Sequence, residues 1–408
     1  MSNPSYNFHY NNCQSNNFND RDNSYNRNTF HQSNNSPYIH NIYNNDYKNL
    51  DYPGFQKANY IQGSQNQTNI NNPIINDCMI KYNYGFEKDL CGIKNYGNNC
   101  YFNSGLQILV SCERFLEELK KYNTCYGGPL TKLLREAIYI LQNEKKYEPY
   151  AFLTYFTKKN TEFFGVQSCS QNFIRTLLKN LNDELNTTNN NLIVAAEYYR
   201  PPIDTEEGLK YYNFIKSNNI YPESSLLSIF SGITKSHSLK NCDFCKGYIN
   251  NISFSYFIDQ NIYLDEINSQ SKWRFSDVLR KNFEKTNITM NCPYCHQEIN
   301  LSEETKIIKL PEILIFTLER YQGENNDAEI EPDDSIEMKN YVDNCLINTR
   351  TSYELFAINI RFGKTKNSGH EICQVKRKGK WLEFNDEFGY AKVKDYNRNS
   401  YGLFYKRK

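Results

Sequence analysis

The sequence predicts an α+β fold, because the globular part of the chain has helical segments first and strand-like segments later. Between residues 100 and 186 apolar residues recur at helical spacing, whereas from Ser253 onward short β-branched or aromatic runs partly alternate with polar residues. Helices and strands that are segregated along the chain are typical of α+β architecture. The 408 residues suffice for one large domain or two ordinary ones.

Residues 1–85 differ from the rest in composition. They are rich in Asn, Tyr, Ser and Gln and contain very little Leu or Val. Such a segment cannot bury enough aliphatic surface to offset its chain entropy. We therefore expect a disordered N-terminal extension, followed by a folded domain over residues 86–408. A tolerated low-complexity extension is favoured over an interaction tail.

Composition excludes several functional classes. The formal net charge is +1, from 47 basic and 46 acidic residues, which favours neither a nucleic-acid partner nor a membrane surface. The 13 cysteines are an odd number, no secretory signal opens the chain, and no apolar run is long enough to span a bilayer. We expect a soluble monomer with mostly free thiols in a reducing compartment, the cytosol or nucleus.

The first predicted helix begins near Cys100, where Phe102, Leu106 and Leu109 fall at helical spacing. Further helices are predicted over residues 128–144 and 170–186, and a loop over Asn186–Asn191. Strands are predicted over residues 252–264, 305–321, 353–363, 370–377, 380–386 and 402–408. The acidic, polar run Glu324–Ser335 predicts an exposed loop.

Cys100 is a candidate nucleophile because it lies at the predicted start of a helix. There the helix dipole and free backbone N–H groups favour the thiolate, which is the reactive form. Position alone is weak evidence, since a cysteine near a helix start is more often a small buried apolar residue.

His370 is a candidate base. It follows Gly369 and opens one predicted strand, while Asn385 and Asp386 end the next one. If these strands pair, the imidazole lies beside the Asn385 amide, and a base oriented by a third group is the logic of nucleophilic triads, including the Cys-His-Asn variant. A lone histidine on a strand is more often structural.

Two CxxC pairs, Cys242/Cys245 and Cys292/Cys295, form a candidate metal site. Two such hooks allow a tetrahedral site of four thiolates, the ligand set of structural zinc. The segment between the two CxxC pairs, residues 246–291, is longer than in a compact zinc ribbon. We therefore expect a pair of long strands between the two pairs. The alternative is a coincidental pair of free-thiol motifs.

These motifs together resemble the ubiquitin-specific proteases. GIKNYGNNCYFNSGLQILV resembles the cysteine box of that family, and GHEICQVKRKGKWLEFND its histidine box. SLLSIFSGITKSHSLKNCDFC is similar to the segment that enters the family's fingers region, IIKLPEILIFTLERY to its LxR strand, and SYGLFYKRK to its closing strand. The resemblance covers about residues 90–408, in the family's order.

The resemblance implies a papain-like cysteine protease core, made of a helical thumb and a β palm, with zinc-bearing β fingers at about residues 225–310. By position, Cys100 is the nucleophile, His370 the general base, Asn385 the residue that orients the imidazole, and Asn95 an oxyanion donor. Asp386 is either a second carboxyl partner of His370 or a turn carboxylate. The zinc is expected to be structural, because four thiolates leave no open coordination position.

The same resemblance implies that ubiquitin and ubiquitinated proteins are the partners. Gln167, Asn172 and Gly369 are the expected substrate-binding residues. GVQSCSQNF aligns with the family's QQDxxEF helix, but Cys169 and Asn172 stand where the family has acids that face the arginines of the ubiquitin tail. Losing both acids weakens a charge-assisted interaction, unless nearby carboxylates such as Glu162 or Glu184 compensate.

Two other departures are Asn99, where the family commonly has Thr, and Glu371, where it commonly has an aromatic residue. Neither removes a catalytic group. We therefore predict a deubiquitinase that hydrolyses the bond after the C-terminal glycine of ubiquitin. The alternatives are a protease for another ubiquitin-like modifier and an inactive, ubiquitin-binding scaffold; retention of Cys100, His370 and Asn385 favours the enzyme.

Overall fold

The computed structural model describes residues 90–122, 127–185, 199–217, 224–269, 271–321, 326–346, 348–365, 368–391 and 399–408. The predicted N-terminal extension (1–85) and the predicted loop Asn186–Asn191 lie outside these described residues. Within them, no helix is both long and apolar enough to cross a membrane.

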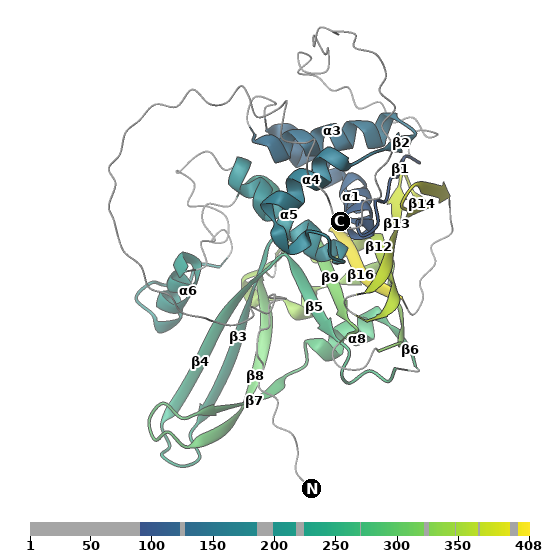
Figure 1. Cartoon of the computed structure of the whole chain (residues 1–408). Helices are drawn as coiled ribbons and strands as arrows, with labels where there is room; N and C mark the ends of the chain where they lie inside the picture. Colours follow the sequence, from purple (N-terminus) through teal and green to yellow (C-terminus); the bar gives the residue numbers. More distant parts are fainter. Residues whose placement is uncertain are drawn as a thin grey trace, which may run out of the picture.

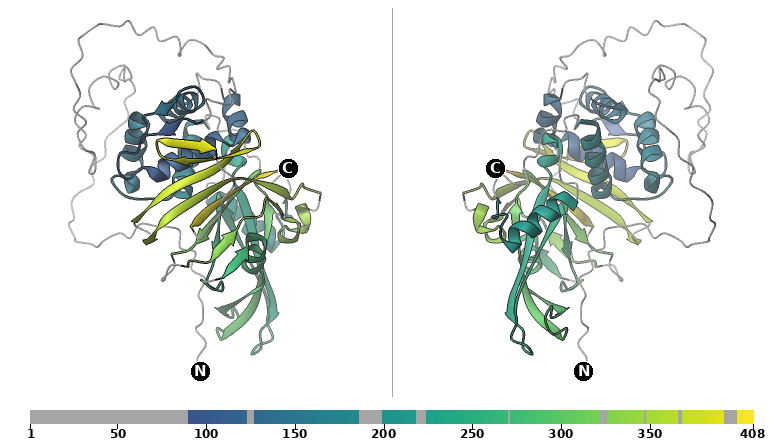
Figure 2. Two further views of the ribbon diagram at one scale, coloured as in Figure 1. Left: turned by 90° about the vertical axis from the view of Figure 1, so that its right-hand side faces the viewer. Right: turned by 90° about the vertical axis from the view of Figure 1, so that its left-hand side faces the viewer.

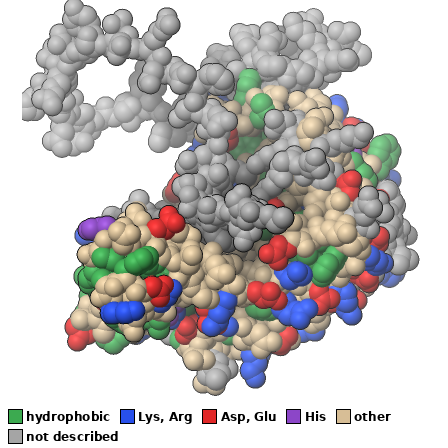
Figure 3. All heavy atoms as spheres, turned by 90° about the horizontal axis from the view of Figure 1, so that it is seen from below, with side chains coloured by type: hydrophobic (Ala, Val, Ile, Leu, Met, Phe, Trp, Pro, Cys, Tyr) green, Lys and Arg blue, Asp and Glu red, His purple; other side chains and the backbone are tan. Residues whose placement is uncertain are grey.

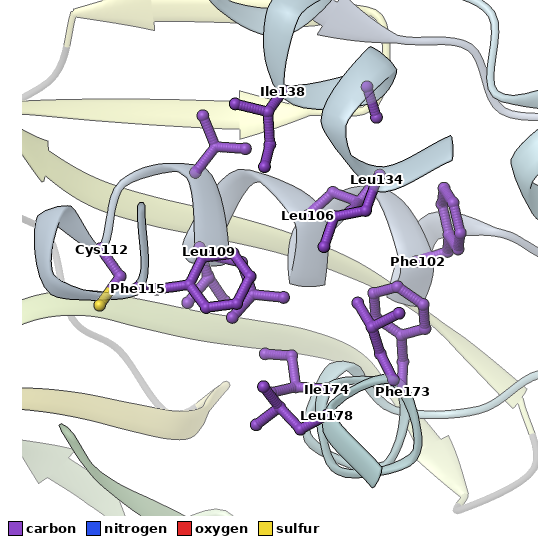
Figure 4. Packing of buried hydrophobic residues seen from close by; sticks show 14 of the residues in the cluster. Phe102, Leu106, Leu109, Cys112, Phe115, Leu134, Ile138, Phe173, Ile174 and Leu178 are labelled. Carbon is purple, nitrogen blue, oxygen red and sulfur yellow. The ribbon is translucent and has the colours of Figure 1, made fainter. Parts of the chain in front are cut away.

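The first part of the fold is a group of helices around a buried central helix, α1 (Figure 1). Every residue of α1 is buried. Figure 4 shows its residues Phe102, Leu106 and Leu109 pointing toward side chains of two flanking helices, α3 and α5. The helices are α1 (Cys100–Val110), α2 (Glu113–Lys121), α3 (Pro129–Asn143), α4 (Tyr150–Lys159), α5 (Ser170–Leu185) and the 3₁₀ turn η2 (Thr161–Phe163). A short parallel pair, β1 (Gly92–Ile93) and β2 (Lys146–Tyr147), lies beside them.

The other face of α1 packs on a mixed eight-stranded sheet. Its order is β15-β14-β13-β12-β16-β9-β5, with β11 paired to β12. The strands are β5 (Asp259–Tyr263), β9 (Ile313–Glu319), β11 (Ser335–Glu337), β12 (Ser352–Thr365), β13 (Ser368–Arg377), β14 (Lys380–Asn385), β15 (Phe388–Ala391) and β16 (Ser400–Arg407). Burial of both faces explains the near-continuous apolar run of β9. Figure 2 shows the helices on one side of this sheet.

A separate four-stranded sheet of order β4-β3-β8-β7 projects away from the helices (Figures 1 and 2). Its strands are β3 (Gly232–Asn241), β4 (Tyr248–Phe257), β7 (Thr286–Asn291) and β8 (Glu298–Lys309). Viewed from below, its tip shows hydrophobic and charged side chains intermixed (Figure 3). Few apolar side chains are buried at this tip, and they surround the two CxxC pairs.

The remaining elements connect these parts. They are α6 (Glu206–Ser217), α7 (Ser225–Ser228), β6 (Lys272–Arg274), α8 (Phe275–Asn282), β10 (Glu329–Glu331) and the 3₁₀ turns η3 (Lys339–Tyr341) and η4 (Asn344–Leu346). Three of the elements between the two CxxC pairs, β5, β6 and α8, lie outside the four-stranded sheet.

The structure confirms the helices predicted at Cys100 and over residues 128–144 and 170–186, and it corrects two expectations. The strands begin earlier than Ser253, because β3 is a half-polar strand that alternation did not reveal. The segment Glu324–Ser335 is not only an exposed loop: its described part contains β10, where buried Ile330 pairs with Trp273 of β6. One apolar residue between two glutamates gives too weak a period-2 signal to predict this strand.

Candidate active site and metal centre

Cys100 is the first residue of α1, as predicted. The loop before it is shaped by Asn99, whose Oδ1 accepts from the backbone N–H of Tyr96 (2.6 Å) and whose Nδ2 donates to Asn103 Oδ1 (2.9 Å). Asn99 therefore supports the loop and does not cap the helix with its side chain.

The structure corrects the expectation of a stabilised thiolate at Cys100. The side chain is buried, and burial raises the pKa of the thiol to about 11, with smaller raising contributions from the charges of Glu371 and Asp386. The backbone N–H of Glu371 acts in the opposite direction and lowers the pKa. The loss of hydration raises the pKa more than the helix N-terminus lowers it. In the unliganded protein the neutral thiol is therefore favoured at neutral pH.

His370 and Asn385 come together through the pairing of β13 with β14. His370 Nε2 lies 2.8 Å from Asn385 Oδ1. Because an amide oxygen only accepts, this contact places the ring proton on Nε2 and leaves Nδ1 as the basic nitrogen. The sequence-based expectation that paired strands bring these two side chains together is confirmed.

The strand that carries His370 also packs against the helix that begins at Cys100. α1 packs on β13, and the backbone N–H of Glu371, the residue after His370, contributes to lowering the pKa of the Cys100 thiol. The base and the thiol, separated by some 270 residues of sequence, thus lie on adjoining elements of one site. A His370 ring that turns Nδ1 toward α1 can accept the thiol proton, which is the arrangement that nucleophilic catalysis requires.

Asp386 connects the end of β14 to the cysteine loop. Its Oδ2 accepts from Asn95 Nδ2 (2.8 Å), its Oδ1 from Asn103 Nδ2 (2.7 Å), and its backbone oxygen from the N–H of Ile93 (2.7 Å). It adopts a left-handed conformation (φ 49°), which Asp tolerates better than most residues. Its Oδ2 also lies 3.8 Å from His370 Nε2. Asp386 is thus both a turn residue and a carboxylate near His370.

The candidate substrate residues lie at two edges of the site. Gly369 precedes the histidine, and a Cβ there would lie 2.5 Å from the carbonyl oxygen of Phe362, so only glycine fits. Asn172 lies in the first turn of α5, where its Oδ1 is 3.4 Å from Arg175 Nη1. Gln167 is half-buried just before that helix, and its Oε1 has no hydrogen-bond partner among the described residues.

The four candidate ligands converge at the tip of the four-stranded sheet. All four sulfurs lie within 4.8 Å of one another, and the Cys242–Cys295 and Cys245–Cys292 sulfurs are 3.6 and 3.7 Å apart. Tetrahedral Zn²⁺ with bonds of about 2.3 Å places its sulfurs about 3.8 Å apart. These residues therefore could hold one metal ion, and zinc fits the donor set.

The two hooks have the same backbone conformation, which supports a built site. Each occupies the turn of a hairpin, β3–β4 or β7–β8, and each is followed by a non-glycine residue of positive φ, Lys246 (61°) or His296 (58°). In each turn that residue's N–H donates to the carbonyl of the first cysteine. Two identical turns that face one another present four sulfurs to a common point.

Comparison with known proteins then decides the family. The chain matches the family described as "Ubiquitin carboxyl-terminal hydrolase" over residues 91–405. It belongs to the ubiquitin carboxyl-terminal hydrolase family. Its resemblance to the ubiquitin-specific proteases is thereby confirmed. The mixed α+β fold and the four-cysteine fingers are those of this group of hydrolases.

The chain matches only part of the length of several relatives. "Ubiquitin carboxyl-terminal hydrolase 17-like protein B" of Mus musculus is 25% identical over 332 residues, covering 77% of this chain and 63% of that protein. "Ubiquitin carboxyl-terminal hydrolase 23" of Arabidopsis thaliana is 24% identical over 352 residues, covering 79% and 37%. The chain thus spans about a third to two thirds of these relatives.

Among solved structures, the SAGA Ubp8/Sgf11/Sus1/Sgf73 DUB module bound to ubiquitin aldehyde has a TM-score of 0.59 at 18% identity, covering 79% of this chain and 71% of that one. A yeast SAGA DUBm structure has a TM-score of 0.61 at 19% identity, covering 79% and 70%. At this identity the likeness shows the ubiquitin hydrolase fold alone.

Sequence reasoning missed two parts of this candidate site. Asn103 donates to Asp386, and its place one helical turn after Cys100 was the available signal. Glu371 and Arg361 form a buried ion pair behind His370. The sequence places one charged residue on each of two strands but does not show that the two side chains meet. The carboxylate of Glu184 accepts from the N–H groups of Leu130 and Thr131 at the start of α3.

The raised thiol pKa predicts the pH dependence of alkylation of the unliganded protein. We expect iodoacetamide to modify Cys100 slowly at pH 7 and roughly tenfold faster for each pH unit up to about pH 10, because only the thiolate reacts. Peptide mass spectrometry of the full chain measures this rate, with glutathione as a reference thiol of ordinary pKa. A plateau near pH 7 would show a preformed thiolate and contradict the effect of burial.

Proposed function

We propose that this chain is a cysteine-type deubiquitinase that hydrolyses the peptide or isopeptide bond after the C-terminal glycine of ubiquitin. The His370–Asn385 contact beside the helix that begins at Cys100 carries the proposal. Family membership supports the reaction class, and the similar SAGA module was solved bound to ubiquitin aldehyde, which supports ubiquitin as the substrate.

The proposed reaction is acyl transfer in two stages. His370 Nδ1 takes the proton of Cys100 as the sulfur attacks the glycine carbonyl, and the imidazolium then protonates the departing amine as the C–N bond breaks. Water, deprotonated by the same imidazole, attacks the thioester and releases the glycine carboxylate and the thiol. Asn385 holds the imidazole in the required tautomer throughout.

Asn95 is the proposed side-chain donor to the oxyanion. In the unliganded protein its amide donates to Asp386, so the amide is held near the site and must reorient or share its protons when the oxyanion forms. Asp386 is then the residue that positions this donor, together with Asn103.

We expect Asn95→Ala to lower kcat by roughly 10²–10³-fold with little change in KM, because the oxyanion exists only in the transition state. Steady-state kinetics with a fluorogenic ubiquitin C-terminal substrate measures both constants. Asn98→Ala, a neighbouring loop amide that donates to the carbonyl of Gly165, is the matched control. Equal losses in the two variants would indicate loop damage and not an oxyanion donor.

A protease for another ubiquitin-like modifier is the second candidate, and one observation favours it. Asn172 places a neutral amide where the resemblance leads one to expect an acid, and the neighbouring Arg175 is already paired with Asp259. Turnover of tail-modified substrates tests the choice. If the chain acts on ubiquitin, neutralising the tail arginines lowers kcat/KM; if it acts on another modifier, such substrates are cut equally well or better.

The remaining proposals concern organisation. We propose that residues 86–408 form the catalytic domain, with fingers at about 225–310 that hold one structural zinc, and that the chain acts as a monomer in the cytosol or nucleus. The four converging sulfurs support the zinc. A full chain that hydrolyses no ubiquitin-type substrate while binding ubiquitin would favour the scaffold alternative.

A further inference from the structure

A buried charge network lies directly behind the catalytic strand. Glu371 follows His370 on β13, so its side chain points to the opposite face of the strand, where it is 0% exposed. Its Oε1 accepts from Arg361 Nη1 at 2.7 Å, and the Arg361 side chain is only 2% exposed. Both charges are therefore desolvated next to the active site.

The second oxygen of Glu371 binds residues of two other elements, α5 and β12. Oε2 accepts from the backbone N–H of Ser170 (2.9 Å), from the Ser170 hydroxyl (2.5 Å) and from Asn359 Nδ2 (3.2 Å). Ser170 is the first residue of α5, and its hydroxyl oxygen also lies 3.0 Å from the carbonyl oxygen of Tyr101. A carboxylate at this helix terminus satisfies an otherwise unpaired N–H and complements the helix dipole.

Arg361 is itself fixed in place. Its Nη1 also donates to the carbonyl of Ser168 (3.0 Å), and its guanidinium lies 5.9 Å from the ring centroids of Tyr321 and Tyr401. A buried charge is tolerated only with such a complete set of partners. The pair is thus a built element of the site.

The backbone of Glu371 links this network to the chemistry. It lies on the strand that packs against α1, while its side chain binds the start of α5 and, through Ser170, the carbonyl of Tyr101 in α1. A shift of this one residue therefore moves the adjacent His370 relative to the helix that begins at Cys100.

We propose that Glu371, with Arg361 as its counter-ion, is a positioning residue that sets His370 relative to Cys100. This inference rests on the proposed function for its kinetic consequences. It also accounts for the neutral residue at position 169, because Cys169 lies within the electrostatic range of Glu371 and Arg361. An acid there would place a second negative charge beside a pair that is already balanced.

The test compares Glu371→Gln with a matched variant elsewhere. Asp333 is also a buried carboxylate that pairs with an arginine, Arg274, and accepts a backbone N–H at the start of a helix, that of Ser276 in α8. Figure 1 shows α8 away from α1. Asp333→Asn removes a carboxylate with the same kinds of partner outside the active site, although Arg274 is 67% exposed and Arg361 only 2%.

We expect Glu371→Gln to lower kcat per folded molecule roughly 10- to 100-fold with KM within about twofold, because small displacements of reacting groups cost that much. Asp333→Asn should lower the melting temperature and leave kcat unchanged. The double variant Arg361→Gln/Glu371→Gln should recover melting temperature, since no charge is stranded, yet keep the low kcat. It also gives the kinetic result if the single variant does not fold.

Three results would overturn the proposal: an unchanged kcat in Glu371→Gln, an equal kcat loss in Asp333→Asn, or full recovery of kcat in the double variant. If the native chain turns over no substrate, the proposed function fails instead. Hydrogen exchange then tests the network alone. Glu371→Gln should accelerate exchange at residues 170–173 and 369–373, Asp333→Asn should not, and unchanged exchange in both would contradict the proposal.

Discussion

Replacing Cys100 by alanine abolishes hydrolysis of a ubiquitin C-terminal substrate, by at least about 10⁴-fold in kcat, because no other group can form the acyl intermediate. The fold should survive. The side chain is small and buried, and the hydrogen bonds that shape its loop come from Asn99, Asn103 and Asp386. Steady-state kinetics and thermal melting of the same preparation measure both effects.

Cys112→Ala is the matched control for this substitution. Cys112 is also a buried free thiol of the helical part, 3% exposed, but it lies before α2 and away from His370. We expect it to cost some stability and no activity. Retained turnover in the Cys100 variant, or an equal loss in the Cys112 variant, would remove Cys100 from its role.

Replacing Cys292 by serine should remove the metal and unfold the four-stranded sheet. Few apolar side chains are buried around the hooks, so this end of the fold depends on the metal for its stability. Structural zinc contributes on the order of 10 kcal/mol in small zinc domains at neutral pH. We expect about one zinc per chain in the native protein and almost none in the variant, by elemental analysis.

Cys345→Ser provides the control for this experiment. Cys345 is a half-buried free thiol outside the four-cysteine cluster, so its loss should leave the zinc content unchanged. Hydrogen exchange then locates the damage, which we expect in β3, β4, β7 and β8 and not in α1. A metal-free native protein with a protected four-stranded sheet would contradict the structural zinc.

Much of this site could be predicted from the sequence because its residues lie in local motifs. The cysteine box has to form a loop followed by a helix, and the two segments of the histidine box have to pair as neighbouring strands. His370 and Asn385 therefore meet through β-sheet register alone. The CxxC hooks are equally local, since each is a single hairpin turn.

The rest depends on contacts that no local pattern encodes. The high pKa of Cys100 follows from how closely α1 is buried, and Asp386 binds Asn95 and Asn103 only because β14 ends beside the cysteine loop. Glu371 shows the same limit: alternation along β13 places it inside, but its partner Arg361 lies on another strand. Desolvation and long-range pairing decide these features.

The central claim is that Cys100 and His370 act as one catalytic unit. The most direct measurement is to treat the full chain with a ubiquitin C-terminal electrophile and map the modified residue by mass spectrometry. The account predicts modification at Cys100 and at no other of the 13 cysteines, with a rate strongly reduced in His370→Ala. Modification of another cysteine, or an unchanged rate in that variant, would contradict it.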